Sequence, residues 1–304
     1  MTEQKNISSR AWLEMLLLAL LWGASFLSIR VALDEIGPLT AVAHRVGWAA
    51  LALWLVALVM RLPLPRDPRV WGAFLVMGLL NNVIPFGLMA WGQLHIESGL
   101  TSIFKAATAI FGVLVAALFF ADERMSLQKA IGVTLGFAGV ATAIGLENLL
   151  NFNIQSLAQL AVIGGTISYA LAGVWARKTL TDQPPQVAAA GMVSGATVII
   201  LPLAWMIEGP ISLSLEACTV WAISYYALAG TALAYLLYYR VLIMAGSGNL
   251  MLVTLLIPPV AIVLGAVILN EALRPEAYAG FALLALGLAV LDGRIWRLMR
   301  DWFR

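Results

Sequence analysis

The chain has 304 residues, of which 62% are hydrophobic and only 11% are charged, and its mean hydropathy is +0.93. Because soluble domains carry about 25% charged residues, this composition excludes a water-soluble globular protein and predicts a polytopic membrane protein. The single cysteine, Cys218, excludes an internal disulfide framework, and a net charge of +2 without a soluble basic surface excludes a nucleic-acid partner.

Ten apolar runs follow one another along the chain. Each has about 20 residues or slightly more, which is enough to cross a hydrocarbon core of about 30 Å. Short turns rich in glycine and proline separate them, so there is no room for a soluble domain. The sequence therefore predicts an all-α polytopic membrane protein with ten transmembrane helices. They are expected at residues 11–33, 39–60, 70–93, 98–120, 127–146, 156–177, 186–207, 217–240, 247–269 and 275–296.

The two halves of the chain repeat one plan. Glu123 and Glu271 stand 148 residues apart, and so do Gly132 and Gly280. Because each half holds an odd number of spans, five, the second half enters the membrane from the opposite face, which predicts inverted repeats. We expect one integrated membrane domain, with the first repeat at 1–146, a periplasmic linker at 147–155 and the second, inverted repeat with its cytoplasmic tail at 156–304.

The distribution of lysine and arginine predicts the orientation. Most of these residues at span ends fall on the side that holds both termini, among them Arg61, Lys129 and Arg240, whereas Arg30 and Arg274 fall on the other. Positive charge accumulates on the cytoplasmic side of membrane proteins. Both termini are therefore expected in the cytoplasm.

These features carry a family resemblance. With ten spans in two repeats, the stretch Leu21 to Phe26 (LWGASF) in the first span, and Glu123 and Glu271 at the ends of the fourth and ninth, the chain resembles the EamA-type drug/metabolite transporter superfamily. Within this superfamily, the chain is similar to YddG-type exporters of aromatic amino acids. The resemblance extends over essentially the whole chain. It implies a bacterial inner-membrane protein with a central cavity lined by spans 1–4 and 6–9, and with spans 5 and 10 at the periphery.

Signatures of catalysis are missing from the sequence. The chain has no phosphate-binding loop, no His-Glu-x-x-His and no nucleophile elbow, and its only histidines are His44 and His95. We therefore expect no enzyme activity, no catalytic residue, no metal site and no cofactor. The expected partners are a small-molecule metabolite and membrane lipid, and a monomer is compatible with the sequence.

Lys105 is a cation inside the fourth span. It lies about 10 Å below the outer surface at 1.5 Å per residue. A charge at this depth costs a few kcal/mol unless it pairs, snorkels or faces water. An anchor for a substrate carboxylate and a lysine whose head reaches the outer vestibule both fit this position.

Polar and aromatic side chains supply the other candidates for a cavity wall. Asn81 and Asn82 lie at the centre of the third span and point about 100° apart, so we expect one to face the cavity and the other to pack. Deep aromatic residues suit a flat apolar substrate, although packing is the alternative explanation for them. They are Trp22 and Tyr169 near the midpoints of spans 1 and 6, and Tyr235, Tyr238 and Tyr239 on one face of span 8.

Prolines interrupt two spans near the midplane. Pro258 and Pro259 lie in the ninth span and Pro85 in the third. Proline removes a helical donor and crowds the preceding turn, so a helix that contains it bends or opens. We expect these prolines to be hinges.

Titratable residues are scarce away from the span ends. Glu14 lies about one turn inside the cytoplasmic end of the first span, where a structural ion pair and a role in proton coupling both fit. His44 is a second possible coupling residue. Together with Arg45 it falls near the outer end of span 2, where Asp34 or Glu35 is available for pairing, so we expect a solvated rim or an outer gate there.

The sequence as a whole predicts an inner-membrane transporter that exports small metabolites by alternating access, with neutral or aromatic amino acids and related compounds as substrates. Two alternatives remain. One is a permease of the same superfamily for drugs or for other metabolites, such as sugar nucleotides or lipid-linked compounds. The other is a channel-like membrane protein, which would need rings of polar residues along a pore.

Overall fold

The structure, a computed structural model, describes residues 8–121, 125–145, 153–250 and 252–292. These residues form helices and include no strand. Eight of the described helical segments are long and apolar enough to cross a membrane, and two shorter apolar helices follow them. The prediction of an all-α membrane protein with ten spans is confirmed.

The helices of the first half begin at residues suited to helix starts. Ser8 and Asp67 accept hydrogen bonds from free N–H groups in the first turns of their helices, and Pro38 and Pro68 open theirs. The elements are α1 (Ser9–Ala32), α2 (Pro38–Val59), α3 (Pro68–Gly78), η1 (Leu79–Val83), α4 (Ile84–Gly92), α5 (Ser98–Ala106), α6 (Thr108–Phe119) and α7 (Leu127–Ile144). Because α3, η1 and α4 are continuous, and α5 meets α6 at Ala107, these eight elements make five spans.

The second half has the same plan. Asn153 and Ser156 cap the start of its first helix reciprocally. Its elements are α9 (Ile154–Thr179), α10 (Pro185–Glu208), α11 (Ala217–Ser224), η2 (Tyr225–Leu233), α12 (Ala234–Leu250), α13 (Leu252–Ile268) and α14 (Pro275–Asp292). α11, η2 and α12 form one continuous span.

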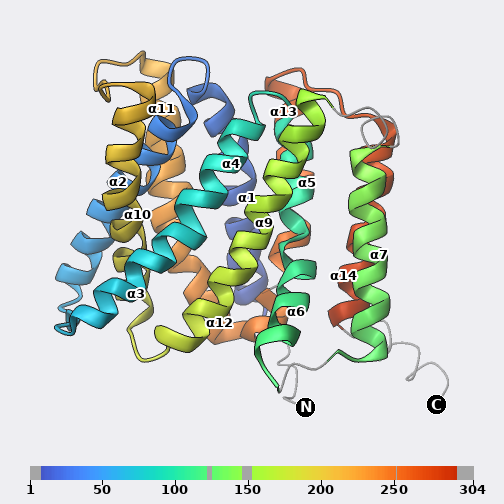
Figure 1. Ribbon diagram of the computed structural model, residues 1–304, viewed down its shortest axis with the longest axis horizontal. Coiled ribbons are helices and arrows are strands. Elements are labelled where there is room, and N and C mark those ends of the chain that lie inside the picture. The colour runs from blue at the N-terminus through green and yellow to red at the C-terminus, as the bar shows by residue number, and fades with distance from the viewer. Residues whose placement is uncertain (1–7, 122–124, 146–152, 251, 293–304) are drawn as a thin grey trace.

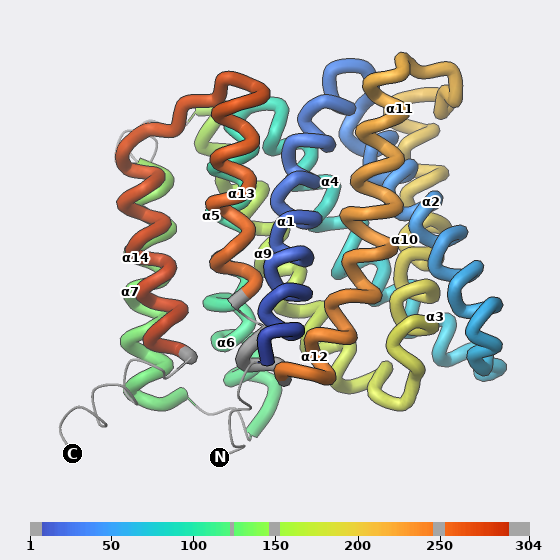
Figure 2. Tube along the Cα trace, turned by 180° about the vertical axis from the view of Figure 1, so that it is seen from behind, coloured from blue at the N-terminus to red at the C-terminus, as the bar shows by residue number. Residues whose placement is uncertain are grey.

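The spans run up and down between two faces of the molecule (Figures 1 and 2). We call the face where α1 begins and α14 ends the lower face, and the face where α2 begins the upper face. Because each repeat has five spans, α1 rises from the lower face whereas α9 descends from the upper face (Figure 1). The two repeats are therefore inverted relative to each other.

α7 and α14 form a pair at one side of the molecule (Figure 1). Glycines allow their backbones to touch: a Cβ on Gly139 would lie 2.6 Å from the backbone nitrogen of Leu284, and one on Gly132 would lie 2.8 Å from the carbonyl oxygen of Gly287. Small residues are the usual means of close helix packing in lipid. The expected peripheral position of spans 5 and 10 is confirmed.

π-helical segments interrupt one span in each repeat. In the first repeat, Pro85 has no N–H to donate, and the N–H of Ile84 bonds to Leu79 rather than to Leu80. The Ser168 hydroxyl donates to the released Leu80 carbonyl at 2.6 Å. η1 starts at residue 79, and the corresponding residue of the second repeat, 226, lies inside η2.

η2 forms without a proline. Thr231 donates its hydroxyl to the Tyr226 carbonyl at 2.7 Å, five residues back, which adds a side-chain bond at the spacing of a π turn. π turns inside helices are frequent at functional sites. Both repeats therefore carry a locally unwound segment at the same depth.

Three carboxylates join the repeats at the upper face by capping helix starts. Glu208 of the second repeat accepts bonds of 2.8 Å from two N–H groups in the first turn of α2, and Glu35 of the first repeat accepts the N–H of Glu216 at the start of α11. Glu271 accepts the Ser98 N–H at 3.0 Å and its hydroxyl at 2.7 Å at the start of α5. Helix N-termini carry free N–H groups and a partial positive charge, so anions stabilise them. We call this set the upper caps.

Two glycines leave room for these caps. A Cβ on Gly37 would collide with the Glu208 carboxylate, and a Cβ on Gly265 would collide with that of Glu271. Glu123, the sequence counterpart of Glu271, lies outside the described residues, and so do residues 147–152 of the expected linker.

Two predicted boundaries are wrong. Span 8 was expected to end at residue 240 and span 9 to begin at residue 247, but α12 continues to Leu250 and α13 begins at Leu252. Arg240 does not end the helix because its guanidinium pairs with Glu14 of α1 at 2.5 Å while half of its side chain stays exposed. A cation near a membrane surface is accommodated in this way without a helix end.

α13 contains the consecutive prolines that the sequence predicts to be a hinge. α13 remains helical through Pro258 and Pro259, and two of its backbone carbonyls lack the usual N–H donors. We expect Pro258→Ala/Pro259→Ala to stiffen α13 and to change the labelling of cysteines placed along it from the two faces. The exposed Pro202 inside α10 offers a matched control, Pro202→Ala. If the double variant is labelled like its parent from both faces, α13 is not a hinge.

Candidate functional site

A cavity of about 480 Å³ lies between the two repeats. Its wall is formed by α1 to α6 of the first repeat and by α9, α10, η2, α12 and α13 of the second. It reaches toward the lower face, because Ala176 near the end of α9, Leu242 of α12 and Thr254 near the start of α13 belong to the wall. A volume of this size is typical of small-molecule sites.

The structure brings most of the predicted substrate-binding residues to this cavity. The wall includes Trp22, Asn81, Lys105, Tyr169, Tyr235, Tyr238 and Tyr239. Asn82 is fully buried behind the wall. The expected division between the two asparagines, one at the cavity and one packed, corresponds to these positions, whereas their part in binding remains a prediction.

Lys105 lies among three aromatic rings. Its Nζ is 5.3 Å from the ring centre of Trp22, 5.4 Å from that of Phe26 and 5.9 Å from that of Tyr169. Aromatic faces attract cations within about 6 Å and replace part of the lost hydration. The helix breaks next to this lysine, at Ala107, and the Thr108 hydroxyl donates to the Lys105 carbonyl at 2.7 Å.

Arg45 is the residue that the sequence did not assign to the cavity. The expectation of a solvated rim is wrong for it, because its side chain is buried and belongs to the cavity wall. Its Nε donates to the Thr231 hydroxyl of η2 at 2.9 Å, and its Cζ lies 4.0 Å from the ring centre of Phe86. The π segment of the second repeat thus positions a cation of the first.

A tyrosine connects the two asparagines. The Tyr235 hydroxyl donates to Asn82 Oδ1 at 3.1 Å and accepts from Asn81 Nδ2 at 3.3 Å. Asn81 Nδ2 also contacts the Met192 sulfur at 3.2 Å. Hydrogen bonds between buried side chains restrict the positions of the groups that they join. Tyr235 on α12 and Asn81 and Asn82 in η1 therefore hold one wall of the cavity together across the repeats.

The cavity is closed toward the upper face. Beyond Arg45 and Lys105 lies a small space of about 20 Å³, bordered by Phe26, Ile29 and Gln93. Gln93 Nε2 donates to the Phe26 carbonyl at 3.0 Å. Since the upper caps lie above this constriction, the structure represents a conformation that faces the lower side.

Comparison with known proteins gives the family. The sequence pattern of the EamA-like transporter family matches residues 10–145 and again residues 156–291, which together are most of the chain. The chain belongs to the EamA-like transporter family. The double match also corresponds to the two structural repeats, so the protein is a multi-pass membrane transporter and not an enzyme.

This EamA-like transporter is similar in sequence to proteins described as amino-acid exporters and efflux pumps. It is 28% identical over 297 residues to a "Probable terminal-alkyne amino-acid exporter" of Streptantibioticus cattleyicolor, with 95% of each chain covered. It is 22% identical to a "Probable amino-acid metabolite efflux pump" of Escherichia coli, with 93% of this chain and 95% of the relative covered. A solved crystal structure with 18% identity superposes with a TM-score of 0.67 over 95% of this chain and 99% of the other, which supports the fold.

The two residues considered for proton coupling do not line the cavity of this EamA-like transporter. Glu14 is buried near the lower face, where its Oε1 pairs with Arg240 of α12 and, at 3.3 Å, with Arg10. His44 is buried and its Nδ1 accepts from the Trp48 indole at 3.3 Å. Glu14 thus has the environment of a structural ion pair that joins the repeats.

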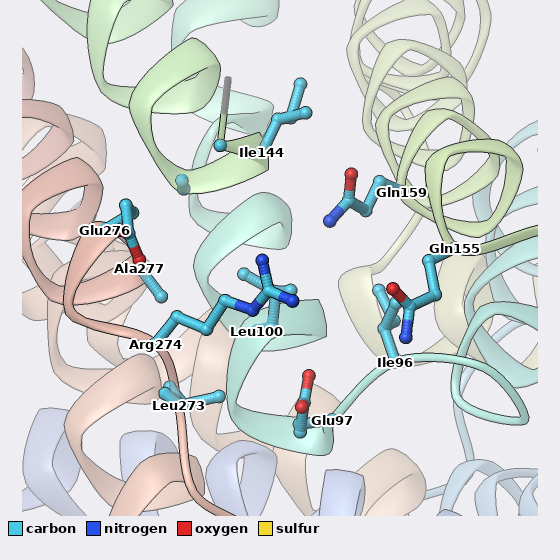
Figure 3. Close-up of a pocket in the computed structure, with 12 residues that line it drawn as sticks. Ile96, Glu97, Leu100, Ile144, Gln155, Gln159, Leu273, Arg274, Glu276 and Ala277 are labelled. Atoms are coloured by element: carbon cyan, nitrogen blue, oxygen red, sulfur yellow. The ribbon is translucent and has the colours of Figure 1, made fainter. Parts of the chain in front are cut away.

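A second hollow opens at the upper face (Figure 3). This crevice of about 300 Å³ lies between the α7 and α14 pair and the starts of α5 and α9. Arg274 extends into its middle, with Glu97, Gln155 and Gln159 around it (Figure 3). It shares no lining residue with the central cavity, and its charges are mixed, whereas the wall of the central cavity carries only cations.

Proposed function

We propose that this EamA-like transporter exports small carboxylates, namely neutral and aromatic amino acids and related metabolites. The observation that carries the proposal is the pair of cations, Lys105 and Arg45, on the wall of one aromatic cavity. The names of two relatives, an amino-acid exporter and an amino-acid metabolite efflux pump, agree with this substrate class.

The chemistry of the wall fits such a substrate. A carboxylate that leaves water needs a positive charge or several donors, and Lys105 and Arg45 supply both. The flat side chain of an aromatic amino acid has Trp22, Tyr169 and Tyr238 as apolar contacts on the same wall. The charged and apolar parts of the substrate are therefore matched within one cavity.

The proposed mechanism is alternating access. The structure faces the lower side, which we assign to the cytoplasm of a bacterial inner membrane from the distribution of lysine and arginine. Export requires that the lower side closes and the upper side opens, which exchanges the roles of the inverted repeats. Opening the upper side breaks or moves the upper caps, since each of them joins one repeat to the other.

The cations also separate this proposal from its main rival. A permease for cationic drugs needs carboxylates or uncharged aromatic faces at its cavity, and none of the described cavity-lining residues is acidic. Lys105 already occupies the aromatic faces nearest to it. The cavity therefore favours anions over cations.

The first test removes the charge of Lys105. Lys105→Met keeps an unbranched apolar stem and deletes the ammonium, so the carboxylate of phenylalanine loses one charge-assisted hydrogen bond, worth about 1.5–3 kcal/mol. We expect its half-saturation concentration in liposome transport to rise about ten- to a hundredfold. Lys178→Met is the matched control, because Lys178 lies over Phe119 outside the cavity. An unchanged half-saturation concentration in folded Lys105→Met would contradict the proposal.

The second test concerns energy coupling. Because no described carboxylate lines the cavity and Glu14 is held in an ion pair, we expect counterflow of phenylalanine in liposomes without any ion gradient. Glu14→Gln is expected to leave this counterflow independent of pH gradients, although it removes an ion pair between the repeats. Strict dependence of the parent protein on an imposed pH gradient, abolished in Glu14→Gln, is the result that would refute uncoupled transport.

A further inference from the structure

The charge balance of the central cavity narrows the substrate class. Ten acidic residues have described side chains, and none of them belongs to the cavity wall. Several are paired elsewhere: Glu14 with arginines, Asp34 with Arg30 at 2.6 Å, and three in the upper caps. Lys105 and Arg45 therefore face the cavity with no carboxylate of the described chain as a partner.

A substrate ammonium would find no negatively charged partner among the described residues that line this cavity. The hydroxyls of Ser102, Thr108 and Thr231 donate their protons to backbone carbonyls. Their oxygens remain available as hydrogen-bond acceptors for an ammonium, but these oxygens carry no charge. The rings of Trp22 and Tyr169, which could hold a second cation, already face Lys105. Two fixed cations also repel a third positive charge at short range in a medium of low dielectric constant.

We infer that the preferred substrates carry net negative charge: aromatic or large apolar carboxylates without a free α-ammonium, such as 2-oxo acids and N-acylated amino acids. This inference rests on the proposed function, because it concerns the same cavity and the same carboxylate-binding cations. It differs from that function in ranking a zwitterionic amino acid below its own deaminated or acylated form. The substrate's charge, and not its side chain, decides the ranking.

The test compares substrates that share one side chain. Purified protein in liposomes is measured in counterflow with phenylalanine, phenylpyruvate and N-acetylphenylalanine, with no variant needed. We expect both anions to show a half-saturation concentration about tenfold or more below that of phenylalanine, from the like-charge repulsion that they avoid. Protein-free liposomes set the passive leak of each compound.

A charge-reversal variant tests whether charge, and not the fit of the substrate's side chain, determines the ratio between phenylalanine and the two anions. Lys105→Glu leaves Arg45 for the carboxylate and adds a partner for the ammonium, so the ratio is expected to shift toward phenylalanine, whereas Lys178→Glu leaves the ratio unchanged. Only variants that remain monodisperse in detergent are compared, and the parent protein alone decides if none does.

The outcomes separate the two claims. Phenylalanine transported as well as or better than both anions overturns the inference and leaves the proposed function intact. Transport of the anions alone supports the inference and removes free amino acids from the proposed function. Transport of none of the three refutes both.

Discussion

Two cations, Lys105 and Arg45, face the central cavity without a partner among the described carboxylates, and the arrangement of the helices around the cavity depends on this constraint. A charge inside the membrane costs several kcal/mol unless its lost hydration is replaced. For Lys105 the replacement comes from three aromatic rings, and for Arg45 from Phe86 and Thr231. These contacts come from both repeats, so the two halves must stay close at this depth. The proposed anionic substrate would add the negative charge that the described wall of the cavity lacks.

The scaffold is symmetric but its charges are not. Trp22 and Tyr169 occupy equivalent places in the two repeats and both line the cavity. Lys105 corresponds to Val253 at the offset of 148, and Arg45 corresponds to Met192 at the offset of 147. In the proposed alternating access the repeats supply the motion, because inverted repeats can exchange conformations, while the first repeat supplies both cations. Each repeat has a π segment, η1 in the first and η2 in the second, so locally unwound backbone lies on both sides of the cavity.

Contacts between the two repeats at the upper and lower faces determine which side of the cavity is open. At the upper face three carboxylates hold helix starts of the opposite repeat, and at the lower face Glu14 and Arg240 join α1 to α12. Contacts made in only one conformation bias the equilibrium toward it. In the present conformation the upper caps are formed while the cavity extends to the lower side, so they stabilise the conformation that faces the lower side.

Hydrophobic run lengths and the shared offset were enough to predict the ten spans and the inverted repeats, and the family resemblance implied the peripheral position of α7 and α14. Lys105 and the deep aromatic residues were found at the cavity because charge and hydroxyl groups are rare at mid-membrane. Arg45 was missed because its distance from the end of the span suggested a rim, and only the fold shows that Phe86 and Thr231 cover it. η2 has no proline to reveal it, and α12 was predicted too short because an exposed arginine resembles a helix end.

The position of a bound carboxylate tests the central claim most directly. A structure of the protein with phenylpyruvate should show the carboxylate about 2.7–2.9 Å from Lys105 Nζ or from the Arg45 guanidinium, with the ring against Trp22 or Tyr169. A ligand bound with its carboxylate away from both cations, or a protein carboxylate paired with Lys105 in the loaded cavity, would contradict the account.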